Sequence, residues 1–543
     1  MKLIYGLVIL GLSCNGTKVY KKNQSHQAVS DVSIAEGERL ASVYCQSCHM
    51  LPDPSLLNAA SWEKGVLPEM GPRLGIFEHG YVKYPNNASD PNIGRGFYPA
   101  QPMVTEEEWQ HLIDYYTAVS PDTLGVQQRV EPIRMDSTLF RVSLPQKGYF
   151  MPLTCMVRID TGAHQLLVSD IARRALYTYD LGLHERDSVF VPGALVDAIF
   201  QPPYMIGCNI GAFLPNNGRA GSALLYRRNS AGAWQADAAP LFKGLERPVE
   251  LAAGDLNGDG RTDYVVCSFG YLIGQLSWME NKGNNQFEEH VLRAVPGAIQ
   301  AHIQDYNKDG KPDLWVEFAQ GDEGIFLFTN KGNGKFEEER VLRFPPCYGS
   351  TYFELDDFNK DGHPDILYTC GDNGDYSTVL KPYHGVYIFL NDGQNHFTQK
   401  YFFPMNGCYR AMARDFDGDG NLDIAAISFF PDCQKQPEEG FVYLHGKGSL
   451  DFTPYSTPAA EAGRWMSMDV GDLDGDGGTE IVLGNCSAGP SFMKGKTDFK
   501  KGPAFMVLRV AAAPPAGRRP MARPLVVRSL VGRRRADRTQ KSE

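Results

Sequence analysis

Four acidic side chains recur at fixed spacing in residues 415–423, which read Asp-Phe-Asp-Gly-Asp-Gly-Asn-Leu-Asp. The acids stand at positions 1, 3, 5 and 9 of this segment. Four carboxylates held so close would raise one another's pKa values unless a cation lay between them. Calcium takes roughly six to eight oxygen ligands in a flexible shell, and a glycine at position 6 permits the turn that directs the first three acids inward. The segment therefore predicts a calcium loop, with the backbone carbonyl of position 7 as a further ligand.

The same nine-residue pattern occurs five times, beginning at residues 255, 305, 357, 415 and 472. An ordinary Asp-Gly hairpin turn is the alternative, but such a turn does not need acids at positions 1, 3 and 9. We expect about five calcium ions. The predicted ligands, at positions 1, 3, 5, 7 and 9 of each copy, are Asp255, Asn257, Asp259, Arg261 and Asp263; Asp305, Asn307, Asp309, Lys311 and Asp313; Asp357, Asn359, Asp361, His363 and Asp365; Asp415, Asp417, Asp419, Asn421 and Asp423; and Asp472, Asp474, Asp476, Gly478 and Glu480.

The spacing of the copies indicates the architecture that positions them. Successive copies begin 50, 52, 58 and 57 residues apart, and each is followed by an apolar run of strand length. In the first four copies a second strand and a Gly-containing hairpin then lead to a phenylalanine, as at Phe336. This period is typical of a four-stranded propeller blade.

These repeats resemble the FG-GAP/VCBS family, which forms calcium-loaded propellers like the integrin head. The resemblance implies an all-β, seven-bladed propeller over residues 137–510, in which residues 157–170 and 195–245 belong to two units without the acids. The final blade lacks an outer strand, and an open edge would favour aggregation. Residues 137–144 alternate apolar and polar side chains, so we predict that they supply this strand.

A second chemical motif, Cys45-Gln46-Ser47-Cys48-His49, is the attachment signature of c-type haem. A zinc or redox Cys-x-x-Cys site is the alternative. Residues 32–122 resemble a small all-α class I cytochrome c domain, with an amino-terminal helix, this motif, a methionine and a closing helix in family order. The resemblance implies one covalent haem c held by Cys45 and Cys48, with His49 as proximal iron ligand and Met103 as distal ligand. Met70, or an open sixth position, remains an alternative to Met103.

The amino terminus predicts export from a bacterial cell. Residues 1–14 have a charged start and an apolar run of signal-peptide length, ending at Cys14 after a small residue, as in a lipoprotein cleavage site. Residues 15–31 are polar and predict a flexible tether. We therefore expect a protein of the periplasm or cell surface, held on the membrane by a lipid anchor.

The ends of the chain differ in charge. The formal net charge is −11, but residues 511–543 hold nine Arg and Lys against two acids, which leaves −18 for the rest. Much of this acidity belongs to the predicted calcium loops, so it does not indicate an acidic functional surface. The basic tail predicts a disordered or aberrant terminus, and nucleic acid is not an expected partner.

The predicted function is electron transfer by the haem domain, with the propeller docking a redox partner protein of the cell envelope or a substrate. No catalytic residue is assigned. One alternative makes the propeller a periplasmic dehydrogenase that feeds the haem, with Arg247, His302, Tyr348, Arg410 and Trp465 near its central channel. Another is a cell-surface adhesion protein, which leaves the haem without a role.

Overall fold

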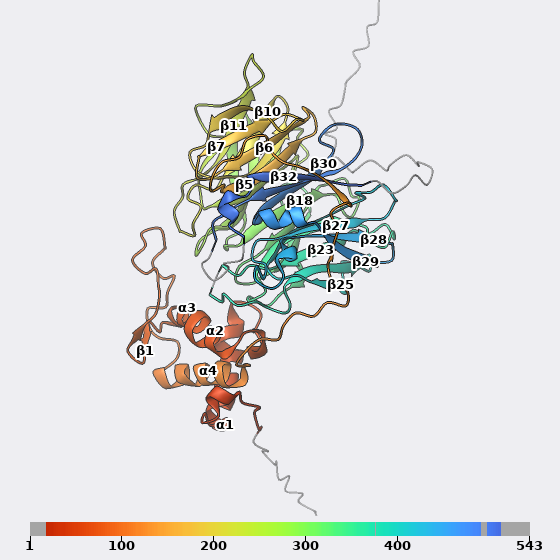
Figure 1. The fold of residues 1–543 in the computed structure, drawn as a ribbon. Helices are drawn as coiled ribbons and strands as arrows, with labels where there is room; N and C mark the ends of the chain where they lie inside the picture. The colour runs from red at the N-terminus through yellow and green to blue at the C-terminus, as the bar shows by residue number, and fades with distance from the viewer. Residues whose placement is uncertain (1–17, 375, 490–496, 512–543) are drawn as a thin grey trace, which may run out of the picture. The chain divides into compact units, whose positions relative to one another are not determined.

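The computed structural model describes residues 18–374, 376–489 and 497–511 (Figure 1). The chain divides into two compact units. The first comprises the described residues up to Val126 together with those of Gly374–Lys381, and the second comprises the remainder. None of the helices in the described ranges has the length and apolar character needed to span a bilayer.

The first unit is built from short helices. Its elements are η1 (Gln24–His26), α1 (Asp31–Tyr44), η2 (Cys45–Ser47), η3 (Pro54–Leu56), α2 (Ala59–Ser61), the π-helix η4 (Trp62–Val66), α3 (Leu67–Met70), η5 (Gly71–Leu74), the hairpin β1 (Glu78–His79) and β2 (Val82–Lys83), and α4 (Glu106–Val119). Helix α4 begins with a capping box that the sequence Thr-Glu-Glu-Glu at residues 105–108 encodes: the Glu108 N–H donates to Thr105 Oγ1 at 3.1 Å, and the Thr105 N–H donates to Glu108 Oε2 at 2.8 Å. This reciprocal pair satisfies two backbone donors that a helix start leaves open.

Helices α1 and α4 pack closely at Gly37. A Cβ atom on Gly37 would lie 1.9 Å from the His111 carbonyl oxygen and 2.7 Å from Tyr115 Cβ, so only glycine permits this approach. Beside the contact, Leu40 of α1 and Leu112 of α4 are fully buried. The two ends of the unit are thus held together by one helix pair, which is visible at the bottom of Figure 1.

Residues 18–30 are more ordered than the tether predicted over residues 15–31. The Asn23 N–H donates to the Ala118 carbonyl at 2.9 Å, and the Asn23 side chain donates to the carbonyls of Thr117 and Ser120. Lys18 pairs with Glu38 at 2.6 Å. The Asn23 contacts cap the carboxyl end of α4, and the Lys18 ion pair ties the segment to α1, so the polar side chains of this segment serve the helices beside it. The predicted signal peptide and Cys14 lie outside the described residues.

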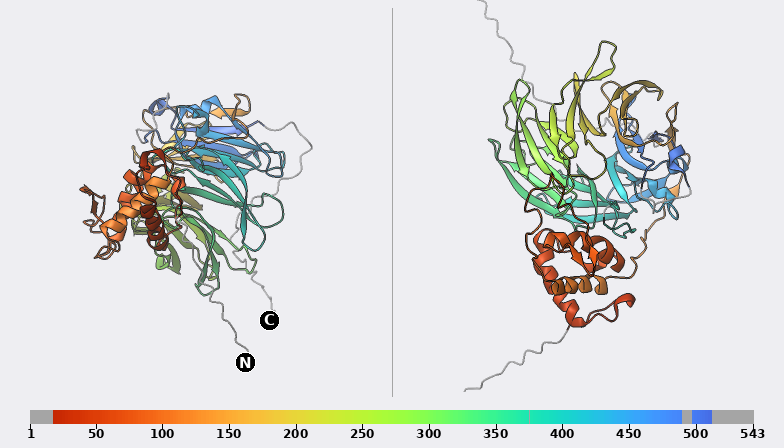
Figure 2. Two further views of the ribbon diagram at one scale, coloured as in Figure 1. Left: turned by 90° about the horizontal axis from the view of Figure 1, so that it is seen from below. Right: turned by 90° about the vertical axis from the view of Figure 1, so that its left-hand side faces the viewer.

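The second unit contains seven antiparallel sheets that follow one another along the chain, and Figure 2 shows them from two further directions. The predicted seven-bladed propeller is confirmed. Its strands are β5 (Thr154–Asp160), β6 (Gln165–Asp170), β7 (Ala175–Tyr179) and β8 (Glu185–Phe190) in blade 1; β9 (Leu195–Gln201), β10 (Tyr204–Asn209), β11 (Gly221–Arg228), β12 (Trp234–Ala236) and β13 (Phe242–Leu245) in blade 2; β14 (Pro248–Gly254), β15 (Asp263–Ser268), β16 (Gln275–Gly283) and β17 (Gln286–Arg293) in blade 3; β18 (Ala298–Gln304), β19 (Asp313–Phe318), β20 (Gly324–Asn330) and β21 (Phe336–Arg343) in blade 4; β22 (Ser350–Asp356), β23 (Asp365–Cys370), β24 (Gly385–Asn391) and β25 (Phe397–Pro404) in blade 5; β26 (Cys408–Arg414), β27 (Asp423–Ser428), β28 (Phe441–Gly446) and β29 (Phe452–Ser456) in blade 6; and β30 (Trp465–Gly471), β31 (Glu480–Asn485) and β32 (Phe505–Val510) in blade 7. The connections in the described ranges contain the short helices η6 (Pro437–Gly440), η7 (Pro458–Ala462) and η9 (Phe499–Lys501).

The ring closes as predicted, through a strand that precedes blade 1. Strand β4 (Phe140–Ser143) pairs antiparallel with β32 and supplies the outer strand of blade 7. Phe140 is buried, and its ring lies 5.7 Å from that of Phe441 and 5.6 Å from that of Tyr443. The first strand of blade 7, β30, contacts β5, the first strand of blade 1. One further strand was not predicted: β3 (Arg134–Met135) adds to blade 6, parallel to β29.

The first strands of the seven blades contact one another in a ring, and a side chain from each one bonds to the backbone of the next. Five acceptors take backbone N–H groups: Asp469 from Ile159 (2.7 Å), Asp197 from Leu251 (3.4 Å), Glu250 from Ala301 (2.6 Å), Gln300 from Phe353 (3.2 Å) and Glu354 from Ala413 (2.9 Å). Two arginines donate to carbonyls: Arg158 to Ala198 (3.0 Å) and Arg410 to Met468 (2.9 Å). Each bond satisfies a backbone group at the free edge of an inner strand, where an unpaired group would be costly.

Apolar side chains fill the spaces between neighbouring blades, as between β15 and β18 or between β19 and β23. The described cysteines are free thiols. Cys267, Cys370 and Cys486 follow their loops on second strands or just after them, are buried, and act as small apolar residues of these cores.

Candidate functional site

Each of the five predicted calcium loops joins the first strand of a blade to the second, in blades 3 to 7. Position 1 directly follows the first strand, and position 9 is the first residue of the second strand, as with Asp255 after β14 and Asp263 at the start of β15. The glycine at position 6 has positive φ in every copy, for example +81° at Gly260 and +92° at Gly420. The turn that the sequence predicted is therefore formed five times, on strands of the propeller's rigid inner part.

The same hydrogen bonds hold the acids in all five loops. In blade 6, Asp415 accepts from the Gly420 N–H at 3.0 Å, Asp417 from the Asp419 N–H at 3.0 Å, and Asp423 from the Phe416 N–H at 3.1 Å. The corresponding bonds recur in the other four copies. Position 5 accepts from the backbone N–H of position 7 in every loop, for example at 2.7 Å between Asp419 and Asn421. The same backbone hydrogen bonds thus orient the ligand side chains in every loop.

The acids converge on one another. In blade 6, ligand oxygens of Asp415, Asp417 and Asp423 lie within 4.8 Å of one another, and Asp472, Asp474 and Glu480 form the equivalent group in blade 7. The position-9 acid is the most buried member of each loop.

Burial raises the pKa of every position-9 acid. The pKa reaches about 6 at Asp365 and at Asp423, and it is also raised at Asp263, Asp313 and Glu480. Neighbouring loop acids act in the same direction. These carboxylates are hard to ionise together unless a cation binds between them, and the cluster offers only oxygen atoms as ligands. Both properties fit the preferences of calcium.

In three of the loops, those of blades 3, 6 and 7, a side chain from outside the loop also faces it, and the sequence analysis missed these residues. Glu280 accepts from the Asn257 side chain at 3.1 Å, His445 Nε2 lies 3.1 Å from Asp417 Oδ2, and Arg509 pairs with Asp476 at 2.6 Å. All come from the third strand of a blade. Only the pairing of that strand with the second strand identifies them, so the sequence held no local signal.

The predicted haem-attachment segment follows α1 in the first unit. Cys45 lies in η2 and is half-buried, and burial raises the pKa of its thiol to about 11. Cys48 is exposed, and both thiols are free. The His49 Nδ1–H donates to the Met50 carbonyl at 2.9 Å, which places the lone pair of the ring on Nε2. Two thiols that could form thioethers and an imidazole Nε2 that could ligate iron lie within five residues. This set fits the chemistry of covalent haem attachment.

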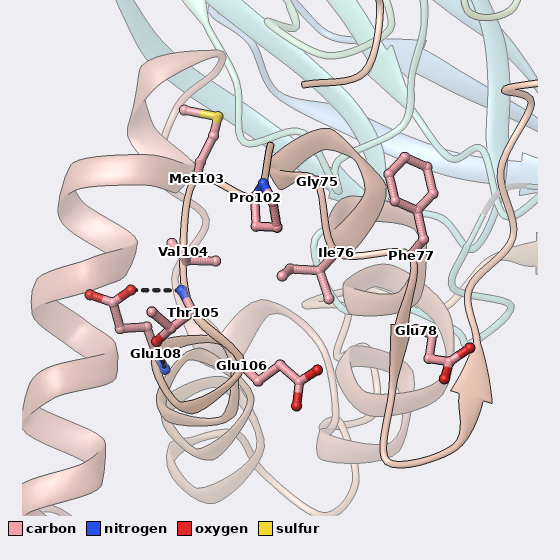
Figure 3. A pocket seen from close by; sticks show the side chains of 10 residues that line it. All are labelled: Gly75, Ile76, Phe77, Glu78, Pro102, Met103, Val104, Thr105, Glu106 and Glu108. Carbon is pink, nitrogen blue, oxygen red and sulfur yellow. Dashed lines mark hydrogen bonds between the residues drawn. The ribbon is translucent and has the colours of Figure 1, made fainter. Parts of the chain in front are cut away.

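The two candidate distal methionines approach the same turn of the backbone. Met70 ends α3 and leads into η5, and the Met103 N–H donates to the carbonyl of Leu74, the last residue of η5, at 2.8 Å. Met103 is 48% exposed. It borders a cavity of about 540 Å³, which Ile76, Phe77 and Val104 also line. Figure 3 shows the Met103 thioether pointing away from Val104 and Glu106. The choice between the two methionines stays a prediction.

The five residues considered for a propeller active site are all engaged in packing. His302 Nε2 lies 3.2 Å from the Phe353 carbonyl oxygen, and burial lowers the pKa of this histidine. Tyr348 stacks on Tyr383 with ring centroids 4.6 Å apart. Arg247, Arg410 and Trp465 donate to the backbone carbonyls of Phe213, Met468 and Ala460. These contacts explain the five side chains as parts of the scaffold.

Comparison with known proteins supports the repeat. A family model described as an FG-GAP-like repeat matches residues 255–316 and 305–368. Integrin alpha-PS5 of Drosophila melanogaster is 33% identical over 122 residues, which are 19% of this chain and 12% of that relative. Among solved structures, the Pan2 WD40 domain of Neurospora crassa aligns at 10% identity and a TM-score of 0.42, over 70% of this chain and 98% of that chain. Sqt1 of Saccharomyces cerevisiae aligns at 9% identity and a TM-score of 0.41, over 68% and 99%. The chain therefore carries FG-GAP repeats, in a propeller whose seven blades follow from the strand pairing itself.

Proposed function

We propose that this chain is an exported electron-transfer protein, with one haem c in its first unit and a calcium-stabilised propeller that docks a partner. The observation that carries the proposal is the group formed by Cys45, Cys48 and His49. It joins two free thiols and an imidazole whose hydrogen bond leaves the lone pair on Nε2. A zinc site would need further ligands, and none of the metal-binding groups found among the described residues includes these three.

Four residues of the first unit would bind the haem. Cys45 and Cys48 would form the thioether bonds, His49 Nε2 would ligate iron on one side, and Met103 would do so on the other. The bound haem would supply a one-electron redox couple. The α1–α4 contact at Gly37 would hold the unit rigid around it, and a rigid site changes little between oxidation states.

The propeller is the interaction module of this proposal. A propeller with FG-GAP repeats indicates a binding role, and the repeats with the integrin similarity indicate an extracellular or cell-surface protein. We infer in addition a bacterial envelope location with a lipid anchor on Cys14, a redox partner protein in that envelope, and calcium in the loops. The repeated hydrogen bonds within each loop support a structural role for the ions.

The haem proposal is tested on protein made in a host that matures c-type cytochromes. We expect one covalently bound haem per chain and a reversible one-electron couple in a redox titration. Cys45→Ser and Cys48→Ser should each weaken covalent attachment, and the double variant should abolish it. Cys347→Ser is the matched control, because this half-buried cysteine lies in the propeller. Protein that carries no haem, or binds zinc at Cys45 and Cys48, would disprove the proposal.

The calcium proposal is tested by the melting temperature of the propeller transition. Excess chelator should lower it, since an ion bound only by the folded state stabilises that state. Asp419→Ala should reproduce part of this loss without chelator. Glu337→Ala is the control and should leave the melting temperature nearly unchanged, because this acid of β21 is 69% exposed and makes a surface ion pair with Lys331. An unchanged transition in chelator would contradict a structural role for calcium.

A further inference from the structure

The five loops share one geometry, but the residue that faces them from one position of the third strand differs from blade to blade. This position is the cross-strand partner of the loop's position 9. In blade 7 the partner of Glu480 is Arg509. In the other blades the register, continued by one residue, brings Glu280 opposite Asp263, Thr329 opposite Asp313, Leu390 opposite Asp365 and His445 opposite Asp423. Among the five loops, an arginine or lysine thus stands at this position only in blade 7.

Arg509 enters its loop and bridges three of the four acids. Its Nη2 lies 2.6 Å from Asp476 Oδ1, and its Nη1 lies 3.2 Å from Glu480 Oε1 and 3.4 Å from Asp474 Oδ2. These are positions 5, 9 and 3, the side-chain ligands that a calcium ion would share with Asp472. A planar guanidinium with five N–H donors suits such a fork of carboxylates.

The loop of blade 7 also has the space that the guanidinium needs. Position 7 is Gly478, and a Cβ atom there would lie 2.0 Å from Arg509 Nη2. The other four loops have Arg261, Lys311, His363 and Asn421 at position 7. Any of these side chains at residue 478 would displace Arg509, so the small residue and the long cation match one another.

The cations near blades 3 and 4 behave differently. Arg261 and Lys311 project from position 7 of their own loops, and each pairs with the position-5 acid of that loop, Lys311 with Asp309 at 2.9 Å. Neither is recorded in an ion pair with the acids at positions 1, 3 or 9 in the described structure. They cover one edge of a loop, whereas Arg509 lies across the ligands themselves.

We propose that Arg509 is the built-in cation of blade 7, so that the propeller binds four calcium ions, in blades 3 to 6, and none in the loop of residues 472–480. This inference rests on the proposed calcium binding and deepens it. Arg509 lies on β32, the strand that pairs with β4 where the ring closes. The blade that joins the two ends of the propeller would then be stabilised without a metal, and its closure would withstand loss of calcium.

The test counts calcium ions on the full-length protein by native mass spectrometry and by equilibrium dialysis. We expect four per chain for the wild type, three for Asp419→Ala in blade 6, and still four for Asp476→Ala in blade 7. Arg509→Gln keeps the strand and removes the charge, and it should raise the number to five. Circular dichroism checks the folding of each variant.

Two results would overturn the assignment. One is five ions on the wild type, and the other is the loss of an ion in Asp476→Ala, which does not depend on the folding of the Arg509 variant. No calcium on any loop would instead remove the proposed calcium binding and the assignment together. The count therefore separates failure of the assignment from failure of the proposed function.

Discussion

The Asp469 carboxylate of blade 7 accepts a hydrogen bond from the backbone N–H of Ile159 in blade 1, at 2.7 Å. Asp469 also lies 3.6 Å from Arg158, which bridges to Asp197 of blade 2 at 3.1 Å. Burial lowers the pKa of Arg158, but the two carboxylates outweigh burial and hold its pKa above the usual range. Three blades are therefore joined by charged groups at the point where the ring begins and ends.

Removing the Asp469 carboxylate should weaken this junction. Asp469→Ala leaves the Ile159 N–H without its acceptor and should lower the free energy of unfolding by about 1–3 kcal/mol. Asp469→Asn keeps an oxygen acceptor and should cost less. Denaturant unfolding in excess calcium measures both, with Glu337→Ala at an exposed site of β21 as control. Equal midpoints for Asp469→Ala and Glu337→Ala would show that the junction contributes nothing.

The closing strand should be essential for a stable propeller. Phe140→Ala empties a buried ring site between blades 6 and 7 and should cost about 3–5 kcal/mol. Leu144 follows the same strand but is 47% exposed, so Leu144→Ala should have little effect. Thermal unfolding followed by circular dichroism compares the two. A Phe140→Ala protein as stable as the Leu144→Ala protein would contradict the role of β4.

Glu317 predicts a pH-dependent stability. Its side chain is fully buried on β19 between the register partners Gln300 and Ile325, and neither carboxylate oxygen has a hydrogen-bond partner among the described residues. Burial raises its pKa well above the usual value, and the acids Glu323 and Glu250 act in the same direction. The folded state therefore holds a proton that the unfolded state releases. Stability from this site is complete below the ordinary glutamate pKa and is lost as the pH rises toward the raised value.

Glu317→Gln should remove this loss. Wild type and variant should unfold with similar free energies near pH 4, and the variant should gain as the pH rises to 8, by about 1.4 kcal/mol for each unit between the folded and unfolded pKa values. Glu337→Gln, at an exposed site of β21, is the control and should show no such trend. A constant difference between wild type and Glu317→Gln from pH 4 to pH 8 would disprove the prediction.

The distal haem ligand can be assigned by matched methionine variants. Met103→Ala should change the sixth ligand and leave the porphyrin attached, because Cys45 and Cys48 hold it covalently. Loss of the methionine–iron charge-transfer absorption in Met103→Ala, with its retention in Met70→Ala, is the expected result. The opposite pattern would assign the ligand to Met70.

Much of the architecture was accessible from the sequence because its signals are local. The nine-residue loops carry their own turn, their own acids and the start of the next strand, so their place between first and second strands followed from residues such as Asp415 and Asp423. The capping pair of Thr105 and Glu108 is likewise contained in four residues. Closure through β4 was predictable because the alternation in residues 137–144 matched the single strand that blade 7 lacked.

The tertiary structure decided what depends on register between distant segments. Asp469 reaches Ile159, and Arg509 reaches Asp476, only because two strands align at a particular offset, and the same residue types elsewhere on a strand would face a core or solvent. The order of residues 18–30 has the same origin, since Asn23 caps a helix that ends almost a hundred residues later. By itself the sequence determined the haem-type motif, the acidic loops and the number of blades, because each repeats or completes a short pattern. Which side chains join the blades, and which loop already holds a cation, was decided by the packing of the closed ring.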